Sequence, residues 1–243
     1  MLLVHGLGAD SDETWGPGAG GDGFLARLIE TEPPYALLCV DYPSRLGLPR
    51  SAASLLPLSS LSAGFATALR ESLLPAFEKL VIVAYCLGGL VARFALADLL
   101  NPQGRAAFSP PSVADGGLML ILLDAPEDWP DSPLDGPMSA ITRMLQVDAP
   151  AMQANAAWWR DRFGPASRID AYAVLSRDHC WVTPFKPGST VPQERVLRSS
   201  VAHLDLVRPS AGGSHEVCDH VAALLAARLG RRSPALAEVR REA

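Results

Sequence analysis

The 243-residue sequence lacks the features that mark membrane-inserted, secreted and nucleic-acid-binding proteins. No apolar run approaches the roughly 20 residues needed to span a bilayer, so we expect no stable membrane insertion. The formal net charge is −5 and no basic stretch is present, which argues against a nucleic-acid partner. The N-terminal residues Met1–Gly6 have no positively charged region, and their apolar stretch is too short for a signal peptide.

The sequence also lacks a pairing pattern among its cysteines, which are Cys39, Cys86, Cys180 and Cys218. Their scattered positions do not suggest a disulfide framework or a zinc knuckle. A reducing compartment is therefore expected, and we predict a cytoplasmic protein. No metal and no cofactor are expected.

Composition favours one folded domain over residues 1–243. Hydrophobic residues make up 49% and charged residues 19%, which suffices for a sizeable core. Short apolar runs alternate with helical patterns, and this alternation predicts an α/β fold with a mostly parallel sheet. The predicted strands are Leu2–Val4, Tyr35–Val40, Leu80–Ala84, Leu118–Leu123, Ile169–Leu175 and about Arg195–Val201.

Helices are predicted between and after these strands. Leucine or phenylalanine recurs every four residues from Leu61 to Leu73, which predicts a helix that Pro75 should end. A second apolar helix face runs from Leu87 to Ala95. A last helix is predicted from about Ser214, a plausible N-cap, to Leu229.

Residues 126–168 lie between two predicted strands and are longer than an ordinary connection. They contain two helix-like pieces, about Met138–Leu145 and Ala151–Phe163, and we predict a lid-like insertion. Trp158 and Trp159 are its candidate substrate-binding residues. The alternative is that these tryptophans only pin the insertion to the core.

The strongest chemical signal is the segment Val81–Leu90, in which a strand runs directly into a helix around Cys86. A nucleophile elbow needs small residues two positions before and after its central residue, and Ala84 and Gly88 occupy these places. The N-terminus of the following helix favours negative charge, which would activate a thiol and stabilise an oxyanion. We therefore predict that Cys86 is the nucleophile.

Two further motifs flank this elbow. The first is Val-His-Gly-Leu-Gly-Ala-Asp at residues 4–10, and the second is Ala-His-Leu-Asp-Leu-Val-Arg-Pro at residues 202–209. In their order and local context the three motifs resemble those of the α/β-hydrolases, in particular the serine esterase and lipase-like branch. The resemblance covers most of the chain and implies the α/β-hydrolase fold.

The elbow departs from that branch in two places. Cys86 stands where serine is usual, and Ala84 replaces the first elbow glycine. Cysteine nucleophiles occur in this fold in dienelactone hydrolases and polyhydroxyalkanoate synthases, whose elbows Tyr-Cys-Leu-Gly-Gly is similar to. Three alternatives to a working thiol are an inert buried cysteine, a decayed enzyme and an engineered replacement of serine.

The resemblance also implies roles for the histidines. His203 matches the position of the family's catalytic histidine and is the predicted general base. His5 belongs to the His-Gly motif, where histidine usually braces the loop, so we predict a structural role. A metal site of His215, Cys218 and His220 is disfavoured, because two of the three spacings do not share a helix face.

The acid has two candidates. Asp178 follows the predicted strand at 169–175 and is the preferred partner of His203, whose charged form it would stabilise. Asp124 resembles the acid position of pancreatic-type lipases and is the alternative. The family resemblance further implies an oxyanion hole made by the backbone N–H groups of Leu7 and Leu87.

Together these residues predict a hydrolase that acts on an ester or thioester of a hydrophobic acyl group, a small-molecule substrate. Cys86, His203 and Asp178 would form its catalytic triad. Two alternatives remain: a cysteine-dependent acyltransferase, and a catalytically inactive binding module with the same fold.

Overall fold

The computed structural model describes residues 1–16, 23–30, 35–44, 57–100, 117–126, 149–162, 169–177, 191–208 and 215–228. The described strands form one six-stranded sheet in the order β2-β1-β3-β4-β5-β6, and every neighbouring pair is parallel. The predicted α/β class with a parallel sheet is confirmed.

The strands are β1 (Leu2–Val4), β2 (Leu38–Val40), β3 (Leu80–Tyr85), β4 (Leu118–Leu123), β5 (Ile169–Leu175) and β6 (Val196–Arg198). Four of them match the predicted bounds to within one residue. The edge strands β2 and β6 are shorter than predicted because each has only one neighbour. The three residues of β1 limit β2, and β6 pairs only with Ala173–Leu175 at the end of β5.

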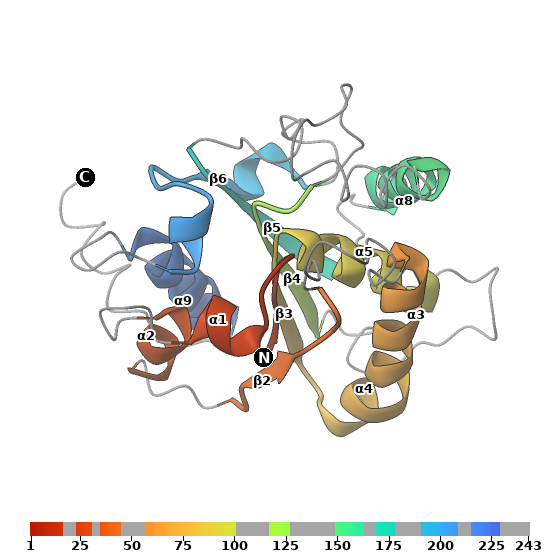
Figure 1. Cartoon of the computed structure of the whole chain (residues 1–243), viewed down its shortest axis with the longest axis horizontal. Coiled ribbons are helices and arrows are strands. Elements are labelled where there is room, and N and C mark those ends of the chain that lie inside the picture. Colours follow the sequence, from red (N-terminus) through yellow and green to blue (C-terminus); the bar gives the residue numbers. More distant parts are fainter. Residues whose placement is uncertain are drawn as a thin grey trace, which may run out of the picture.

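The helices are α1 (Ser11–Trp15), α2 (Phe24–Glu30), α3 (Leu58–Ala68), α4 (Leu74–Ala76), α5 (Leu87–Leu100), α8 (Ala149–Arg162) and α9 (Glu216–Arg228). In Figure 1, α1, α2 and α9 lie on one side of the sheet, and α3, α4, α5 and α8 lie on the other. Short 3-10 turns precede β6 at Gln193–Arg195 and follow it at Leu204–Leu206.

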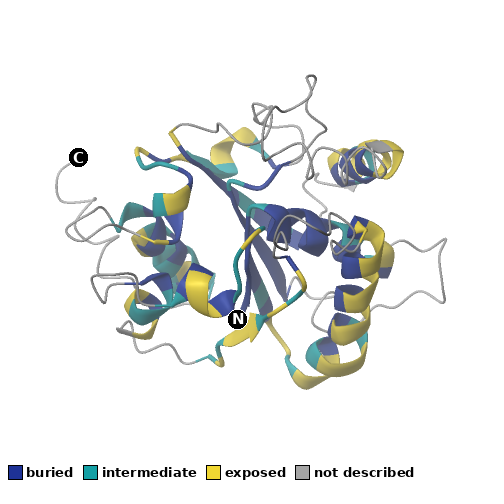
Figure 2. Ribbon diagram, in the orientation of Figure 1, coloured by how far each residue is buried: buried dark blue, intermediate teal, exposed yellow. Residues whose placement is uncertain are grey.

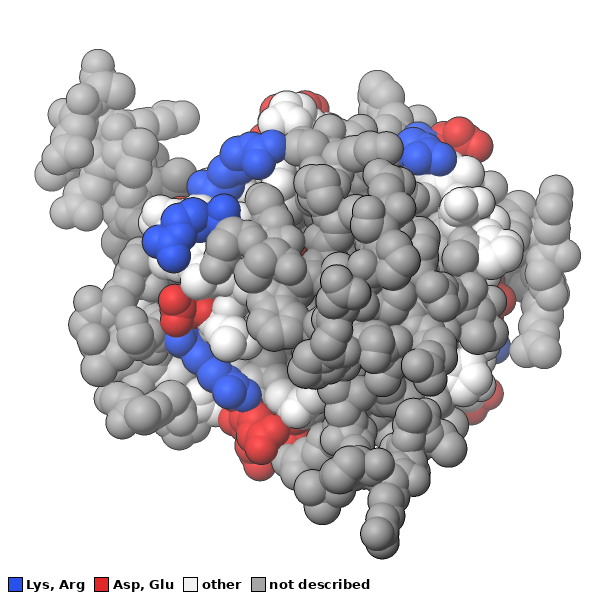
Figure 3. Space-filling view, turned by 45° about the horizontal axis from the view of Figure 1, so that its top comes forward, with Lys and Arg blue, Asp and Glu red and all other residues white. Residues whose placement is uncertain are grey.

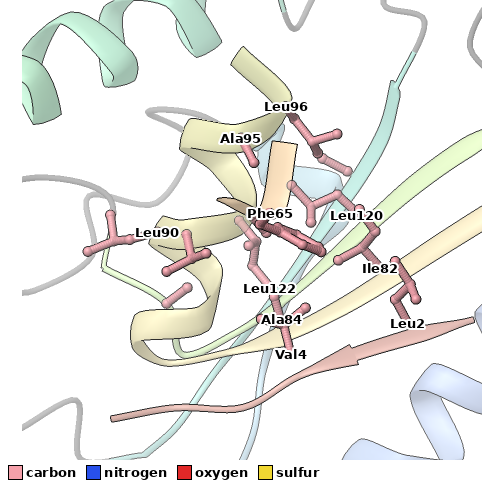
Figure 4. Packing of buried hydrophobic residues seen from close by; sticks show 14 of the residues in the cluster. Leu2, Val4, Phe65, Ile82, Ala84, Leu90, Ala95, Leu96, Leu120 and Leu122 are labelled. Atoms are coloured by element: carbon pink, nitrogen blue, oxygen red, sulfur yellow. The ribbon is translucent and has the colours of Figure 1, made fainter. Parts of the chain in front are cut away.

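Side chains of each strand alternate between two hydrophobic cores. On β1, Leu2 and Val4 join the core beneath α3, α5 and α8, whereas Leu3 joins the core beneath α1, α2 and α9. Figure 4 shows the first core, where Phe65 and Leu90 meet side chains from several strands. Because both faces are covered, β4 is buried at every residue and β3 at all but one (Figure 2), which explains their continuous apolar sequences.

The helix was predicted to end at Pro75, and it continues one residue further, to Ala76. Between α3 and α4 the chain makes a π-helical turn at Leu69–Leu73, in which the Leu74 N–H donates to the Leu69 carbonyl. Pro75 then lies in the first turn of α4, where its missing N–H costs no hydrogen bond, and the helix continues to Ala76.

Two of the predicted helices can be compared only in part. The last helix is present as α9, but Ser214 and Leu229 lie outside the described residues. In the insertion at 126–168, α8 matches the piece predicted at Ala151–Phe163, and the piece at Met138–Leu145 lies outside them.

Charged side chains of both signs lie close together on the described surface. Figure 3 shows basic and acidic residues following one another along one margin of the molecule. Ion pairs on the α9 side include Arg27 with Asp219 at 3.5 Å and Arg195 with Asp170 at 3.3 Å. Among the described residues, no helix is both long and apolar enough to cross a bilayer.

Candidate active site

Cys86 directly follows β3 and precedes α5, with a left-handed φ of 51°. This conformation is unfavourable for a residue with a side chain and persists only where the surroundings enforce it. Gly88 supplies part of that enforcement, because a Cβ there would lie 2.4 Å from the His5 carbonyl oxygen. The Cys86 N–H donates to the Leu123 carbonyl at 2.9 Å, which fixes the turn to the neighbouring strand. The predicted elbow geometry is present.

His203 lies in the loop after β6, immediately before the 3-10 turn at Leu204–Leu206. Its side chain is 9% exposed and packs against Tyr85, the residue before Cys86, with the two rings 4.8 Å apart. The Tyr85 hydroxyl donates to the backbone carbonyl of His203 at 3.2 Å. The last residue of β3 therefore holds both the backbone and the ring of the histidine.

Asp124 directly follows β4 and also has a left-handed φ, of 47°. Its Oδ2 atom lies 2.5 Å from Nδ1 of His203. The hydrogen bond that the sequence analysis assigned to Asp178 is thus made by Asp124, its alternative, while Asp178 lies outside the described residues. The physical reason is position: β4 is the direct neighbour of β3, so its end lies beside the elbow.

Hydrogen bonds dominate the electrostatics of this pair. Burial acts to raise the pKa of the Asp124 carboxyl, but hydrogen bonds from His203 and Ser176 outweigh it and lower the pKa to about 2. Burial acts to lower the pKa of His203, but its hydrogen bonds with Asp124 and Cys86 raise it to about 10. His203 therefore contacts both Asp124 and Cys86 and favours its protonated form.

His5 has the bracing role that the sequence predicted. It is fully buried, its Nδ1 bonds the Gly6 carbonyl at 2.8 Å, and its Nε2 accepts from the Tyr42 N–H at 3.2 Å. The Tyr42 ring stacks on the imidazole at 4.2 Å. Both ring nitrogens are occupied by backbone groups, so His5 shapes the loop that leads to Leu7.

The predicted oxyanion donors are the backbone N–H groups of Leu7 and Leu87. Leu87 is the first residue of α5, and Leu7 lies in the turn at residues 7–8 that follows His5 and Gly6. Within the described part of the chain, neither backbone N–H has a protein acceptor.

The insertion is fixed to α5 through Arg93. The carbonyl of Arg93 accepts from Trp159 Nε1 at 3.2 Å and from Asn155 Nδ2 at 3.5 Å, and its guanidinium donates to the Pro126 carbonyl at 3.3 Å. Trp159 is 1% exposed, so its contacts match the pinning role that was the alternative to substrate binding. Trp158 is partly buried against the same core.

Two of the other cysteines lie in described elements of the fold. Cys218 is buried in α9 with its sulfur 3.7 Å from the Phe24 carbonyl, and Cys39 is exposed on the edge strand β2. Among the residues that the structure describes, no three His, Cys, Asp or Glu side chains are grouped so that they could hold a metal ion.

Two residues that touch the His203–Asp124 pair were not predicted from the sequence. Tyr85 precedes Cys86, and Ser176 directly follows β5 and bonds the Asp124 carboxylate. Both stand at the carboxyl ends of parallel strands, where binding residues in α/β sheets gather. A search of every polar residue at these strand ends would have found them.

A parallel sheet with an elbow at one strand end, beside a histidine–aspartate pair, defines the α/β-hydrolase class. The chain belongs to the alpha/beta hydrolase family, whose profile matches residues 1–241. Among curated proteins, none matches this chain.

Some solved structures are similar to this chain at low sequence identity. A lipase-esterase related protein from Clostridium acetobutylicum has a TM-score of 0.50 and 12% identity, with 92% of this chain and 91% of that protein covered. An extracellular alpha/beta-hydrolase from a Paenibacillus species has a TM-score of 0.46 and 12% identity, with 93% and 96% covered. Phospholipase PlaB from Legionella pneumophila has a TM-score of 0.49 and 13% identity, with 72% of this chain covered. This chain spans 38% of that phospholipase.

Proposed function

We propose that the protein hydrolyses an ester or thioester through a covalent thioester intermediate on Cys86. His203 is the proton carrier and Asp124 is the acid that orients it. The observation that carries this proposal is that one imidazole contacts both the Asp124 carboxylate, at 2.5 Å, and the Cys86 side chain. Nucleophile, base and orienting acid are thereby joined in the order that acyl transfer requires.

Cysteine attacks as its thiolate, so the proton of the Cys86 thiol must pass to a base. His203, whose ring contacts the Cys86 side chain, is the proposed acceptor and becomes the imidazolium. The thiolate attacks the carbonyl carbon, and the imidazolium gives its proton to the departing alcohol or thiol. The neutral imidazole then takes a proton from water, which attacks the thioester, releases the carboxylic acid and restores the pair.

The negative oxygen of each tetrahedral intermediate needs donors. The backbone N–H groups of Leu7 and Leu87 are the proposed oxyanion hole, supported by their lack of protein acceptors in the described structure. Loss of one such donor typically costs ~3 kcal/mol of transition-state stabilisation.

The proposed substrate carries a hydrophobic acyl group. Support comes from the apolar side chains that are partly buried on the α5 side of the sheet, including Leu7, Tyr42 and Trp158. Trp159 has its indole N–H bonded to Arg93 and contributes through packing. Because each buried methylene is worth ~0.8 kcal/mol, p-nitrophenyl esters of medium chain length should react faster than the acetate. Equal rates for acetate and octanoate would contradict this substrate class.

Thiol labelling tests the nucleophile directly. We expect iodoacetamide at neutral pH, followed by peptide mapping, to modify Cys86 first. Cys39 is more exposed, but burial and the charges of Asp41 and Asp12 raise the pKa of its thiol, which slows its reaction. Cys218 is buried. Labelling of Cys39 before Cys86 would contradict an activated thiol.

A burst experiment separates the alternatives. Mixing the protein with p-nitrophenyl octanoate should release one p-nitrophenol per chain from wild type and from C39A, and none from C86A. A burst followed by slow turnover that a thiol or alcohol accelerates would identify an acyltransferase. Neither burst nor turnover from wild type would indicate a binding module.

A further inference from the structure

Ser176 makes two hydrogen bonds to the carboxylate of Asp124. It directly follows β5, is 2% exposed, and stands on the strand next to β4. Its hydroxyl donates to Oδ2 at 2.6 Å and its backbone N–H donates to Oδ1 at 3.2 Å. One residue therefore holds both oxygens of the carboxylate.

The oxygen that accepts from the Ser176 hydroxyl is also the one that faces His203. Oδ2 of Asp124 lies 2.5 Å from Nδ1 of His203 and 2.6 Å from the Ser176 oxygen. The 2.6 Å distance to the Ser176 oxygen is in the short range found when a hydroxyl donates to an ionised acceptor. Rotation of the carboxylate away from the imidazole would thus break the contacts with Ser176 as well.

The chemistry of the serine suits this place. The Asp124 side chain is 7% exposed, and a buried carboxylate without donors takes up a proton. A lysine or arginine would prevent that, but its positive charge would oppose a protonated His203. The hydroxyl and the N–H of Ser176 are neutral donors, so they stabilise the carboxylate and leave its charge to act on the imidazole.

We propose that Ser176 is a positioning residue for the reaction described under "Proposed function", on which this inference rests. It holds the Asp124 carboxylate ionised and turned toward His203. It touches neither Cys86 nor the substrate in this role, and it acts on the rate through Asp124 and His203.

A small buried serine could instead be needed only for packing, and the neighbouring strand offers a matched control. Ser199 directly follows β6, is 5% exposed, and accepts from the Val201 N–H at 3.3 Å through its own hydroxyl oxygen. Removal of this hydroxyl creates a similar small cavity at the same sheet edge without touching Asp124.

The first measurement is the acylation rate constant in the p-nitrophenyl octanoate burst. We expect S176A to lower it roughly 10- to 100-fold, the worth of one hydrogen bond to a charged group, with the dissociation constant of the ester unchanged. S176T, which keeps the hydroxyl, should recover most of the rate, and S199A should match wild type. A rate in S176A equal to that of S199A would overturn the proposal.

The second measurement does not need turnover. The carboxyl carbon of Asp124, labelled with carbon-13 and assigned by its loss in D124N, reports its own titration by NMR. We expect S176A to raise the midpoint by about one pH unit and S199A to leave it unchanged. If S176A fails to fold, S176C, whose thiol is a weak donor, should show the same upward direction. An unchanged midpoint in the folded variant would overturn the proposal.

The two measurements fail in different ways. A wild-type protein without a burst would overturn the proposed function, and a shifted Asp124 titration in S176A would still support its hold on the carboxylate. A normal wild-type burst with no effect of S176A on rate or titration would overturn only the role of Ser176.

Discussion

The turns at Cys86 and Asp124 share one backbone conformation but are held in it by different means. Each residue directly follows a strand and has a left-handed φ, 51° at Cys86 and 47° at Asp124. Each continues the sheet by one hydrogen bond, from Cys86 to the Leu123 carbonyl at 2.9 Å and from Asp124 to the Val174 carbonyl at 2.8 Å. At Cys86, close packing of backbone enforces the turn. At Asp124, side-chain hydrogen bonds hold it.

This difference decides which substitutions each turn tolerates. The Cys86 turn needs Gly88, because a Cβ added there would meet the carbonyl oxygens of His5 and Val4. The Asp124 turn needs donors from Ser176 and His203, and it uses a residue type that visits the left-handed region more readily than most. We expect substitutions at the first turn to affect folding, and those at the second to affect chemistry.

The largest expected effect is on the rate in D124N. Asparagine keeps the shape and the tolerance for a left-handed φ, so the variant should fold, but it lacks the charge that orients and stabilises protonated His203. We expect the burst rate constant to fall by ~10³-fold or more, measured by stopped flow with p-nitrophenyl octanoate.

Asp178 provides the control for that experiment. D178N should retain the wild-type burst if Asp124 is the acid. A larger loss in D178N than in D124N would return the assignment to the residue that the sequence favoured.

The next effect is on stability at the elbow. An alanine Cβ at position 88 would lie 2.4 Å from the His5 carbonyl oxygen and 2.7 Å from that of Val4, so the backbone must move. We expect G88A to lower the free energy of unfolding by about 1–3 kcal/mol in urea denaturation and to slow the burst less than D124N does.

Gly64 in α3 is the matched glycine. Its position is open, with nothing within 4 Å of an added Cβ, so G64A should stabilise the helix by up to ~1 kcal/mol. If G88A were as stable as G64A, packing would not be what holds the elbow.

A pH effect should follow from the charged pair. The pKa of Asp124 is lowered from 3.8 to about 2, so its contribution to stability is complete above pH 3.8 and is lost as the pH falls through 2. The pKa of His203 is raised from 6.5 to about 10, so its contribution is complete below pH 6.5 and is lost as the pH rises through 10.

The pair should therefore contribute most between about pH 4 and 6.5, by about 2 kcal/mol from the Asp124 shift. Urea denaturation of wild type and H203Q across pH 2–10 measures it. The difference in unfolding free energy between the two should be largest in this window, and a constant difference would contradict the assignment.

The smallest effect is expected in Y85F. The variant loses the hydrogen bond to the His203 carbonyl, 3.2 Å long, and keeps the ring contact at 4.8 Å. Burial and the nearby charges of Cys86 and Asp124 raise the pKa of the Tyr85 hydroxyl well above its usual range, so it remains a donor. We expect a loss of about 1 kcal/mol in stability, with the burst rate within a few-fold of wild type. A hundredfold slower burst would show that this hydroxyl positions the imidazole.

The same contrast explains what could be predicted from the sequence. The Cys86 turn is enforced by residues next to it in the chain, so Ala84 and Gly88 made it predictable from the sequence. The strands were predictable because burial on both faces leaves continuous apolar runs. His203 was proposed as the base through its flanking motif, and its ring contacts both Asp124 and Cys86.

The Asp124 turn depends on partners 52 and 79 residues away, Ser176 and His203, and no local pattern records them. Asp124 and Asp178 each come shortly after a strand, and sequence alone does not tell which carboxylate reaches the imidazole. The role of Trp159 could not be predicted from the sequence either, because its partner is a backbone carbonyl on α5.

The sheet also sets the spacing of the functional residues at the carboxyl ends of its strands. Cys86, Asp124 and Ser176 each occupy the first position beyond one of three adjacent strands, β3, β4 and β5. Neighbouring strands are ~4.8 Å apart, so the residues that follow them are spaced at multiples of this distance. A substitution can place a functional group after one strand instead of its neighbour, while the backbone that sets the spacing stays the same. The chemistry at such an edge can therefore change by replacing the residue that follows one strand at a time.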